Sequence, residues 1–394
     1  MIFRNARIIM PREIVRGDLA VENGRIAGIG AARAANGDGL TTNGDGLAAN
    51  GSGLDLEGDH LLPGLVELHT DHLENHYHPR PGVRWNARSA IQAHDAQIAA
   101  SGITTVFDCL RIGTDPGMGP DDFEPGEMRA LADAITTCAR EGRLRAEHFL
   151  HLRCEVSADD AAAEFDAFRD VPNVRLASLM DHAPGQRQFR TMEQYTLYYK
   201  TKRGMSDEAF RRFCEERVAS SARNSERHRL HIAAVARDRG IAVASHDDAT
   251  LAHVADARRD GVAIAEFPTS VEAARASHEA GMAVLMGAPN VVRGRSHSGN
   301  VAARDLAEAG LLDVLSSDYV PLSLVHAPFV LHEELGIALP EAVRTVTDRP
   351  AEAVRLRDRG RIEEGRRADL VRVRYAPGTP PVVRGVWRGG ERVA

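Results

Sequence analysis

Imidazole and carboxylate side chains end an apolar run at residues 61–68. His69 and Asp71 stand two positions apart, so both side chains lie on the same face of an extended strand. Groups of these types on one face could hold a single divalent cation. The alternative is a strand that ends in solvated polar residues, because a His-x-Asp triplet alone is a weak motif.

Later apolar segments end in the same residue types. The carboxyl ends of parallel barrel strands meet at one rim, where active sites are built, so this recurrence predicts a metal centre there. The ligands exceed what one tetrahedral ion needs and favour two ions, with zinc expected and manganese or iron as alternatives. The candidate ligands are His69, Asp71, Glu155, His182, His246 and Asp318, and Asp181, Asp247 and Glu266 also follow strands.

Asp318 ends the last apolar segment, within Ser316-Ser317-Asp318-Tyr319. A carboxylate there could contact a metal ion and accept a proton from its water, whose pKa the ion lowers from about 15.7 to about 7. Asp318 is therefore the candidate catalytic base. The alternative is a cap on the helix that follows.

The elements that position these residues alternate between apolar strand-length segments and helical stretches. Eight such units in a row favour an α/β fold of the (β/α)8 TIM-barrel type over a doubly wound open sheet. Helices are expected at 127–141 and at about 206–239. The predicted strands are 61–72, 103–109, 147–155, 174–182, 241–248, 262–268, 282–288 and 312–318.

Both ends of the chain carry β patterns. Residues 1–60, with the turn Asn23-Gly24, and residues 356–394 are expected to pair as a small β-sandwich domain beside a barrel at 61–355. A glycine-rich insertion at about 33–56 repeats a polar Asn-Gly-Asp-Gly-Leu unit. This repeat is typical of a flexible loop rather than of a calcium-binding turn.

Composition limits the partners. The net charge of -7 gives no reason to expect nucleic acid or an anionic membrane. No apolar stretch approaches the ~20 residues of a membrane span. The four cysteines show no CxxC spacing and the amino terminus lacks a signal-peptide pattern, so a cytoplasmic location is expected. A homodimer is compatible with the sequence, which leaves the oligomeric state open.

Longer motifs carry a resemblance to a known family. The His-x-Asp pair, the strand-end histidines, the last-strand aspartate and the closing Gly-x-Ile-x-x-Gly-x-x-Ala-Asp-Leu-Val at 360–371 resemble the amidohydrolase superfamily. Within it, segments such as 62–71, 179–189 and 244–250 resemble the diphosphatases of phosphonate catabolism. The resemblance implies metal-dependent hydrolysis of the 5-triphosphate of a ribose 1-methylphosphonate, with release of pyrophosphate. Hydrolysis of a C–N bond in a cyclic amide, N-acyl amino sugar or nucleobase is the alternative.

Two departures from the superfamily pattern affect the metal ligands. The first motif is His-x-Asp rather than His-x-His, and neither Lys200 nor Lys202, the two lysines of the chain, lies in a barrel strand. The carboxylated lysine that bridges two metals in many relatives is therefore excluded. Glu155 or His182 takes its place, and the sequence does not decide between them. The role of Glu266 is also open.

A phosphorylated sugar phosphonate substrate would need arginine, backbone N–H groups and hydroxyls around its triphosphate. The segment 291–300 offers all three, and nearly all positive charge in the chain is arginine. The candidate substrate-binding residues are Arg80, Gln186, Arg187, Arg293, His297 and Asn300.

Overall fold

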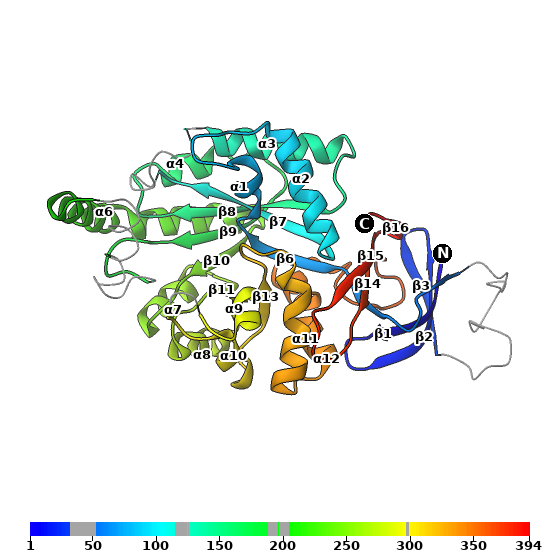
Figure 1. Cartoon of the computed structure of the whole chain (residues 1–394). Helices are drawn as coiled ribbons and strands as arrows, with labels where there is room; N and C mark the ends of the chain where they lie inside the picture. Colours follow the sequence, from blue (N-terminus) through cyan, green and yellow to red (C-terminus); the bar gives the residue numbers. More distant parts are fainter. Residues whose placement is uncertain (32–52, 115–123, 125, 188–195, 197–204, 297–298) are drawn as a thin grey trace, which may run out of the picture.

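Eight parallel strands form a barrel in the order in which they follow along the chain (Figure 1). The computed structural model describes residues 1–31, 53–114, 124, 126–187, 196, 205–296 and 299–394. Eight barrel strands are confirmed, one from each predicted segment, although the segment at 61–72 also holds a strand of a second sheet. They are β6 (Leu65–Thr70), β7 (Ile103–Ile112), β8 (Glu147–Glu155), β9 (Val174–Met180), β10 (Ala242–His246), β11 (Ile264–Glu266), β12 (Ala283–Gly287) and β13 (Val314–Ser316).

The barrel closes where its first and last strands end. Thr70 and Asp318 form an isolated parallel bridge. The Asp318 N–H donates to the carbonyl of His69, and the Asp71 N–H donates to the carbonyl of Asp318, both at 3.1 Å. Closure therefore places the ends of β6 and β13 side by side, which brings the first and last candidate ligands to one rim.

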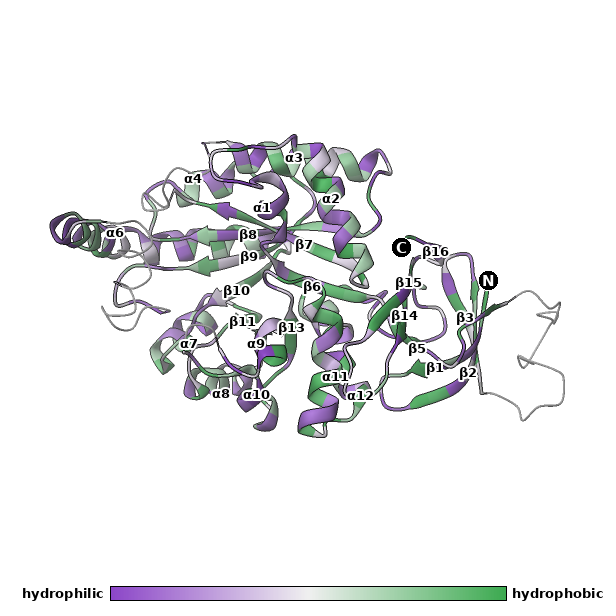
Figure 2. Cartoon of the chain, viewed as in Figure 1, coloured by the Kyte–Doolittle hydropathy of each residue, from purple (hydrophilic) through white to green (hydrophobic). Residues whose placement is uncertain are grey.

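Helices cover the outside of the barrel and carry both hydrophobic and hydrophilic residues (Figure 2). The expected helices are confirmed as α3 (Glu127–Arg140) and α6 (Asp207–Arg239). Ser206 caps α6 by accepting from the N–H of Ala209, and Gly240 ends it with a φ of 68°. The other helices of the described residues are α1 (His72–Tyr77), α2 (Ala87–Ala100), α4 (Ala161–Asp166), α7 (Leu251–Arg259), α8 (Val271–Glu279), α9 (Ala288–Arg293), α10 (Ala303–Glu308), α11 (Ser323–Leu335), α12 (Leu339–Arg344) and α13 (Asp348–Ala353).

A second sheet joins the two ends of the chain, as the sequence predicted, and both termini lie there (Figure 1). Apolar residues from both ends, including Phe3, Leu19 and Trp387, pack into one buried cluster. The strand order is β16 (Glu391–Arg392), β15 (Val382–Arg388), β14 (Leu370–Arg374), β5 (His60–Pro63), β1 (Ile2–Ile9), β2 (Ile14–Glu22) and β3 (Arg25–Ala31), with β4 (Leu54–Asp55) paired to β1.

The single strand predicted at 61–72 is wrong, because the run contains two strands in different sheets. β5 pairs with β1 and β14, whereas β6 pairs with β7 of the barrel. Gly64 separates them at a close approach, since a Cβ there would lie 2.2 Å from Thr104 Oγ1. Beyond Thr70 the chain turns directly into α1.

Two sequence predictions concern other parts of the chain. Most of the Asn-Gly-Asp-Gly-Leu repeat, at 32–52, lies outside the described residues. Within the described ranges, no helix is both long and apolar enough to cross a membrane.

Candidate metal centre and substrate cavity

A cavity opens at the carboxyl ends of the barrel strands. It encloses about 840 Å³ of empty space, part of it open to solvent. Six of the predicted site residues line it together: His69, Asp71, His246, Arg293, Asn300 and Asp318. The other lining residues are Arg153, Asp247, Phe267, Pro268, Met286, Gly287, Pro289, Asn290, Ser296, Val301 and Tyr319.

Three donor atoms converge beside this cavity, whose lining includes His246 and Asp247 but not His182. Asp247 Oδ2 lies 3.4 Å from His246 Nε2 and 3.9 Å from His182 Nε2. This oxygen is buried without a hydrogen-bond partner among the described residues. A buried carboxylate oxygen is rarely left unsatisfied, and here it faces two imidazole nitrogens. This donor set fits a divalent cation of the zinc type.

Buried carboxylates hold the opposite nitrogens of the same rings. His182 Nδ1 lies 2.7 Å from Glu155 Oε2, and His246 Nδ1 lies 3.2 Å from Glu266 Oε2. A carboxylate that accepts from Nδ1–H leaves the Nε2 lone pair for a metal ion. Glu155 thus lies behind His182 in this geometry, on the side away from Asp247.

The charges of these carboxylates follow from their neighbours. Burial alone would raise the pKa of Glu155, but the adjacent His182 and Arg217 lower it to about 2. Burial would likewise raise the pKa of Glu266, and the charges of His151 and His69 hold it well below its usual range. Both groups are therefore ionised at neutral pH.

His69 extends the donor set toward the first strand. Its Nδ1 lies 3.3 Å from Glu266 Oε1, and its ring stacks on that of His246 with centroids 5.7 Å apart. Glu266 therefore contacts both histidines, and it also accepts from Ser178 Oγ at 2.7 Å. His69, His246 and Glu266 form a second group that could hold a metal ion.

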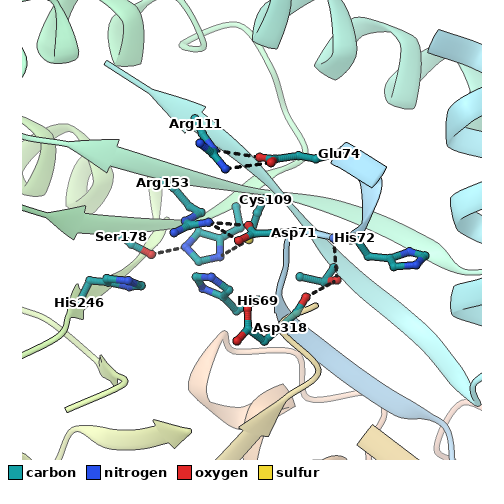
Figure 3. A network of polar contacts seen from close by, with 12 residues as sticks. His69, Asp71, His72, Glu74, Cys109, Arg111, Arg153, Ser178, His246 and Asp318 are labelled. Atoms are coloured by element: carbon teal, nitrogen blue, oxygen red, sulfur yellow. Dashed lines mark hydrogen bonds and ion pairs between the residues drawn. The ribbon is translucent and has the colours of Figure 1, made fainter. Parts of the chain in front are cut away.

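Asp71 is paired with an arginine of β8, the next strand but one in the barrel. Arg153 Nη1, at the end of β8, donates to both carboxylate oxygens of Asp71, at 2.5 and 2.6 Å (Figure 3). Burial would raise the pKa of Asp71, but Arg153 holds it far below its usual range. The pair keeps Asp71 ionised beside the cavity.

Asp318 has a strained backbone that directs it to the same place. Its φ of 54° is unusual for a residue other than glycine. Behind it, buried Glu67 accepts from the N–H of His69 at 2.6 Å and from the N–H of Ser317 at 2.5 Å. Burial raises the pKa of Glu67 to about 7. Glu67 in β6 thus bonds to the backbone of Ser317, which lies between β13 and the candidate base Asp318.

Three candidate substrate residues are not among the residues that line the cavity. Arg80 and Gln186 are exposed, and Arg80 forms an antiparallel bridge with Val83. Arg187 is buried and donates to the carboxylate of Asp248 and the carbonyl of His246. His297 lies outside the described residues.

Arg153 was not predicted from the sequence, and Asp247 was noted at the end of a strand but left out of the candidate ligands. Arg153 and Glu155 stand two apart at the end of a strand, which is the same spacing that drew attention to His69 and Asp71. Asp247 directly follows a histidine already taken as a ligand. Its φ of 57° turns the chain sharply, and no residue pattern signals that turn.

Comparisons with known proteins give the chain's relatives. Residues 73–394 match the model of the amidohydrolase family. The chain is 46% identical over 395 residues to "Alpha-D-ribose 1-methylphosphonate 5-triphosphate diphosphatase" of Escherichia coli (strain K12), with 100% of both chains covered. It is 27% identical to an imidazolonepropionase of Streptomyces coelicolor, over 86% of this chain and 85% of the relative.

Solved structures share the fold at low sequence identity. A 5-methylcytosine deaminase from Klebsiella pneumoniae, liganded with phosphonocytosine, superposes with a TM-score of 0.64 at 16% identity, covering 100% of this chain and 98% of the deaminase. An enamidase superposes with a TM-score of 0.59 at 16% identity, covering 100% of this chain and 95% of the enamidase. Both likenesses concern the arrangement of the chain and not its substrate.

Proposed function

The chain belongs to the amidohydrolase family, and on this basis we propose that it hydrolyses α-D-ribose 1-methylphosphonate 5-triphosphate to pyrophosphate and α-D-ribose 1-methylphosphonate 5-phosphate. One observation carries the proposal: the Escherichia coli diphosphatase of that name aligns with the whole of this chain at 46% identity. In this reaction water adds to phosphorus and the anhydride bond between the α- and β-phosphates breaks.

The cavity offers groups that suit the triphosphate. Arg293 at the end of α9 is exposed and lines the cavity together with Ser296 and Asn300. Guanidinium, hydroxyl and amide groups donate to phosphate oxygens, and the guanidinium binds two oxygens at once. We assign the triphosphate to this wall, which leaves the phosphorus to be attacked beside the donor atoms of His182, His246 and Asp247.

Asp318 is the candidate base for the attacking water. Its carboxylate belongs to the wall that also carries His69 and His246. A proton that leaves the water as the oxygen–phosphorus bond forms can pass to Asp318, and a general base of this kind contributes about 10²–10⁴-fold to a rate. The backbone bridge to Thr70 fixes the position of this carboxylate.

Divalent cations fit the donor sets, and we propose two zinc ions, one held by His182, His246 and Asp247 and a second beside His69 and Glu266. Bound there, the cations would polarise the phosphoryl group and lower the pKa of water toward neutrality. Asp71, Glu155 and Asp318 remain candidate ligands on the sequence pattern, with Glu155 better placed to orient His182.

The cysteines bear on the cellular compartment in which the reaction takes place. All four cysteines are buried and free, which suits a reducing cytoplasm. We propose that the enzyme acts there on a small-molecule substrate. The predictions of a homodimer and of no nucleic-acid partner remain predictions.

Product analysis tests the function. The purified protein, loaded with Zn²⁺, is incubated with the 5-triphosphate substrate and followed by phosphorus NMR. We expect pyrophosphate and the 5-phosphate in equal amounts, and a rate about 10²–10⁴-fold lower for Asp318→Asn. Release of orthophosphate instead would overturn the proposal. Ammonia or carboxylate release from a cyclic amide or nucleobase, with no reaction of the triphosphate, would favour C–N bond hydrolysis.

A further inference from the structure

We propose that His72, His76 and His94 form a second metal site, which takes a late first-row divalent cation such as Zn²⁺ and ties helix α1 to helix α2. None of the three is among the residues that line the cavity. They lie close enough to share an ion, since one ring nitrogen of each lies within 4.8 Å of the other two.

Helix geometry explains how three histidines meet. His72 and His76 are four residues apart in α1, so they lie on one face of the helix, and His94 faces them from α2. The ring centroids of His72 and His76 are 4.8 Å apart, and those of His72 and His94 are 5.4 Å apart. His72 Nδ1 lies 3.1 Å from His94 Nδ1. Zn–N bonds of about 2.0–2.1 Å in a tetrahedron set nitrogens about 3.3–3.4 Å apart, so these rings need little movement.

Buried carboxylates orient the His94 ring toward its two partners. His94 Nε2 lies 2.9 Å from Asp108 Oδ1 in β7, and His148 Nδ1 lies 2.7 Å from Asp108 Oδ2. The other nitrogen of His148 lies 3.2 Å from Asp95 Oδ1. A hydrogen atom on His94 Nε2 donates to Asp108, which leaves the Nδ1 lone pair directed at His72. This carboxylate–histidine arrangement is the usual support of a zinc ligand.

Hydrogen bonding alone does not satisfy the cluster. A bond between the facing Nδ1 atoms of His72 and His94 uses those two nitrogens, but His76 Nε2 is buried without a hydrogen-bond partner among the described residues. An unpaired buried nitrogen destabilises the fold, and a cation with three imidazole ligands would remove that cost. The three ligands are all nitrogen, which favours Zn²⁺, Cu²⁺ or Ni²⁺ over Mg²⁺ or Ca²⁺.

The position of the site gives it a structural role. His72 directly follows Asp71, and its ring points away from Asp71 and Asp318 (Figure 3). An ion held there would anchor the start of α1 without entering the cavity. It would also connect the segment that carries Asp71 to α2 and, through Asp108, to β7.

Metal content tests the site in the full-length protein. The chain is stripped with a chelator, saturated with Zn²⁺, passed through a desalting column and analysed by mass spectrometry for bound zinc. We expect His76→Gln to hold one equivalent fewer than the wild type. His332→Gln, in which an exposed histidine of α11 is replaced, is the matched control and should equal the wild type. Equal zinc content in His76→Gln and the wild type would overturn the proposal.

A second experiment separates this site from the catalytic one. His246→Asn removes a proposed metal ligand of the cavity and leaves the three histidines intact. X-ray absorption of zinc-loaded His246→Asn should show an ion with three imidazole ligands, and His76→Gln in the same chain should abolish that signal. Absence of such an ion from folded His246→Asn would refute the second site, even if His76→Gln fails to fold. Loss of the proposed hydrolysis in either variant does not affect this result.

Discussion

The ring nitrogens at the cavity fall into two sets with different tasks. The Nδ1 atoms of His182 and His246 face Glu155 and Glu266, whereas their Nε2 atoms face Asp247. A residue that binds an ion and a residue that orients a ligand respond differently to substitution, because only the first supplies a bond to the metal. This difference can show whether Glu155, whose role the sequence left open, binds the ion itself or orients His182.

Glu155→Gln should weaken Zn²⁺ binding by about 10–100-fold and leave the site able to bind the ion, because the glutamine still contacts His182 but no longer fixes its tautomer. His182→Asn, which removes the nitrogen itself, should abolish binding of that ion. Competition with a fluorescent zinc chelator measures both affinities. If the two variants lose zinc to the same extent, Glu155 is itself a ligand.

Asp318→Asn should lower kcat by about 10²–10⁴-fold, because the amide cannot accept the proton of the attacking water. The thermal midpoint and zinc content should stay within error of the wild type, since the backbone bridge to Thr70 does not involve the side chain's charge. Steady-state pyrophosphate release and a melting curve give the two readouts. A kcat within a few-fold of normal would remove Asp318 as the base.

Arg293→Ala should raise KM for the triphosphate about 10-fold or more, through loss of a charged hydrogen-bond donor worth about 1.5–3 kcal/mol. Arg295→Ala is the matched control: Arg295 is also exposed, two residues later, and is not among the residues that line the cavity. Kinetics on the triphosphate and on the corresponding monophosphate separate charge recognition from general binding. An equal effect of both substitutions would contradict a phosphate-binding role for Arg293.

Helices and strands could be predicted wherever the residues of one segment determine its conformation without distant contacts. Most barrel strands contain a short apolar run, so their positions could be predicted from the local sequence, and so could the candidate residues His69, His246 and Asp318, which line the cavity at their ends. The break between β5 and β6 at Gly64 could not be predicted in this way, because the residues that crowd it, Thr104 and Asp369, come from distant segments. The pairing of Asp71 with Arg153 joins two strands that are not neighbours in the barrel, and it too depends on closure.

Gly64→Ala tests this junction between β5 and β6. A Cβ there would lie 2.2 Å from Thr104 Oγ1 and 2.8 Å from Asp369 Cβ, so the strands must shift. We expect a loss of about 1–3 kcal/mol in the free energy of unfolding, measured with urea. Thr104→Ala in the same chain should recover part of that loss relative to the sum of the single changes. Strict additivity of the two effects would show that the contact is not the cause.

At the scale of the whole molecule, the barrel and the terminal sheet meet through aromatic rings. His60 in β5 packs edge to face against Phe329 of α11 and against Tyr375 beyond β14, with centroids 6.1 and 6.0 Å away. Its Nδ1 is buried without a hydrogen-bond partner among the described residues. Burial and the positive charge of Arg7 lower the pKa of His60 to about 4.

The burial of neutral His60 in this contact should make the protein sensitive to acid. His60 has a pKa of about 6.5 when the chain is unfolded, so its contribution to stability is complete above that pH. As the pH falls from about 6.5 to about 4, the unfolded chain takes up the proton first, and on the order of 3 kcal/mol of stability is lost. His60→Phe keeps an aromatic ring in this contact, and the phenylalanine side chain cannot be protonated. Urea unfolding at pH 7 and pH 4.5 should therefore show a smaller acid loss in His60→Phe than in the wild type. Equal losses in the two proteins would mean that the acid sensitivity arises from other groups and that His60 is not buried as a neutral ring.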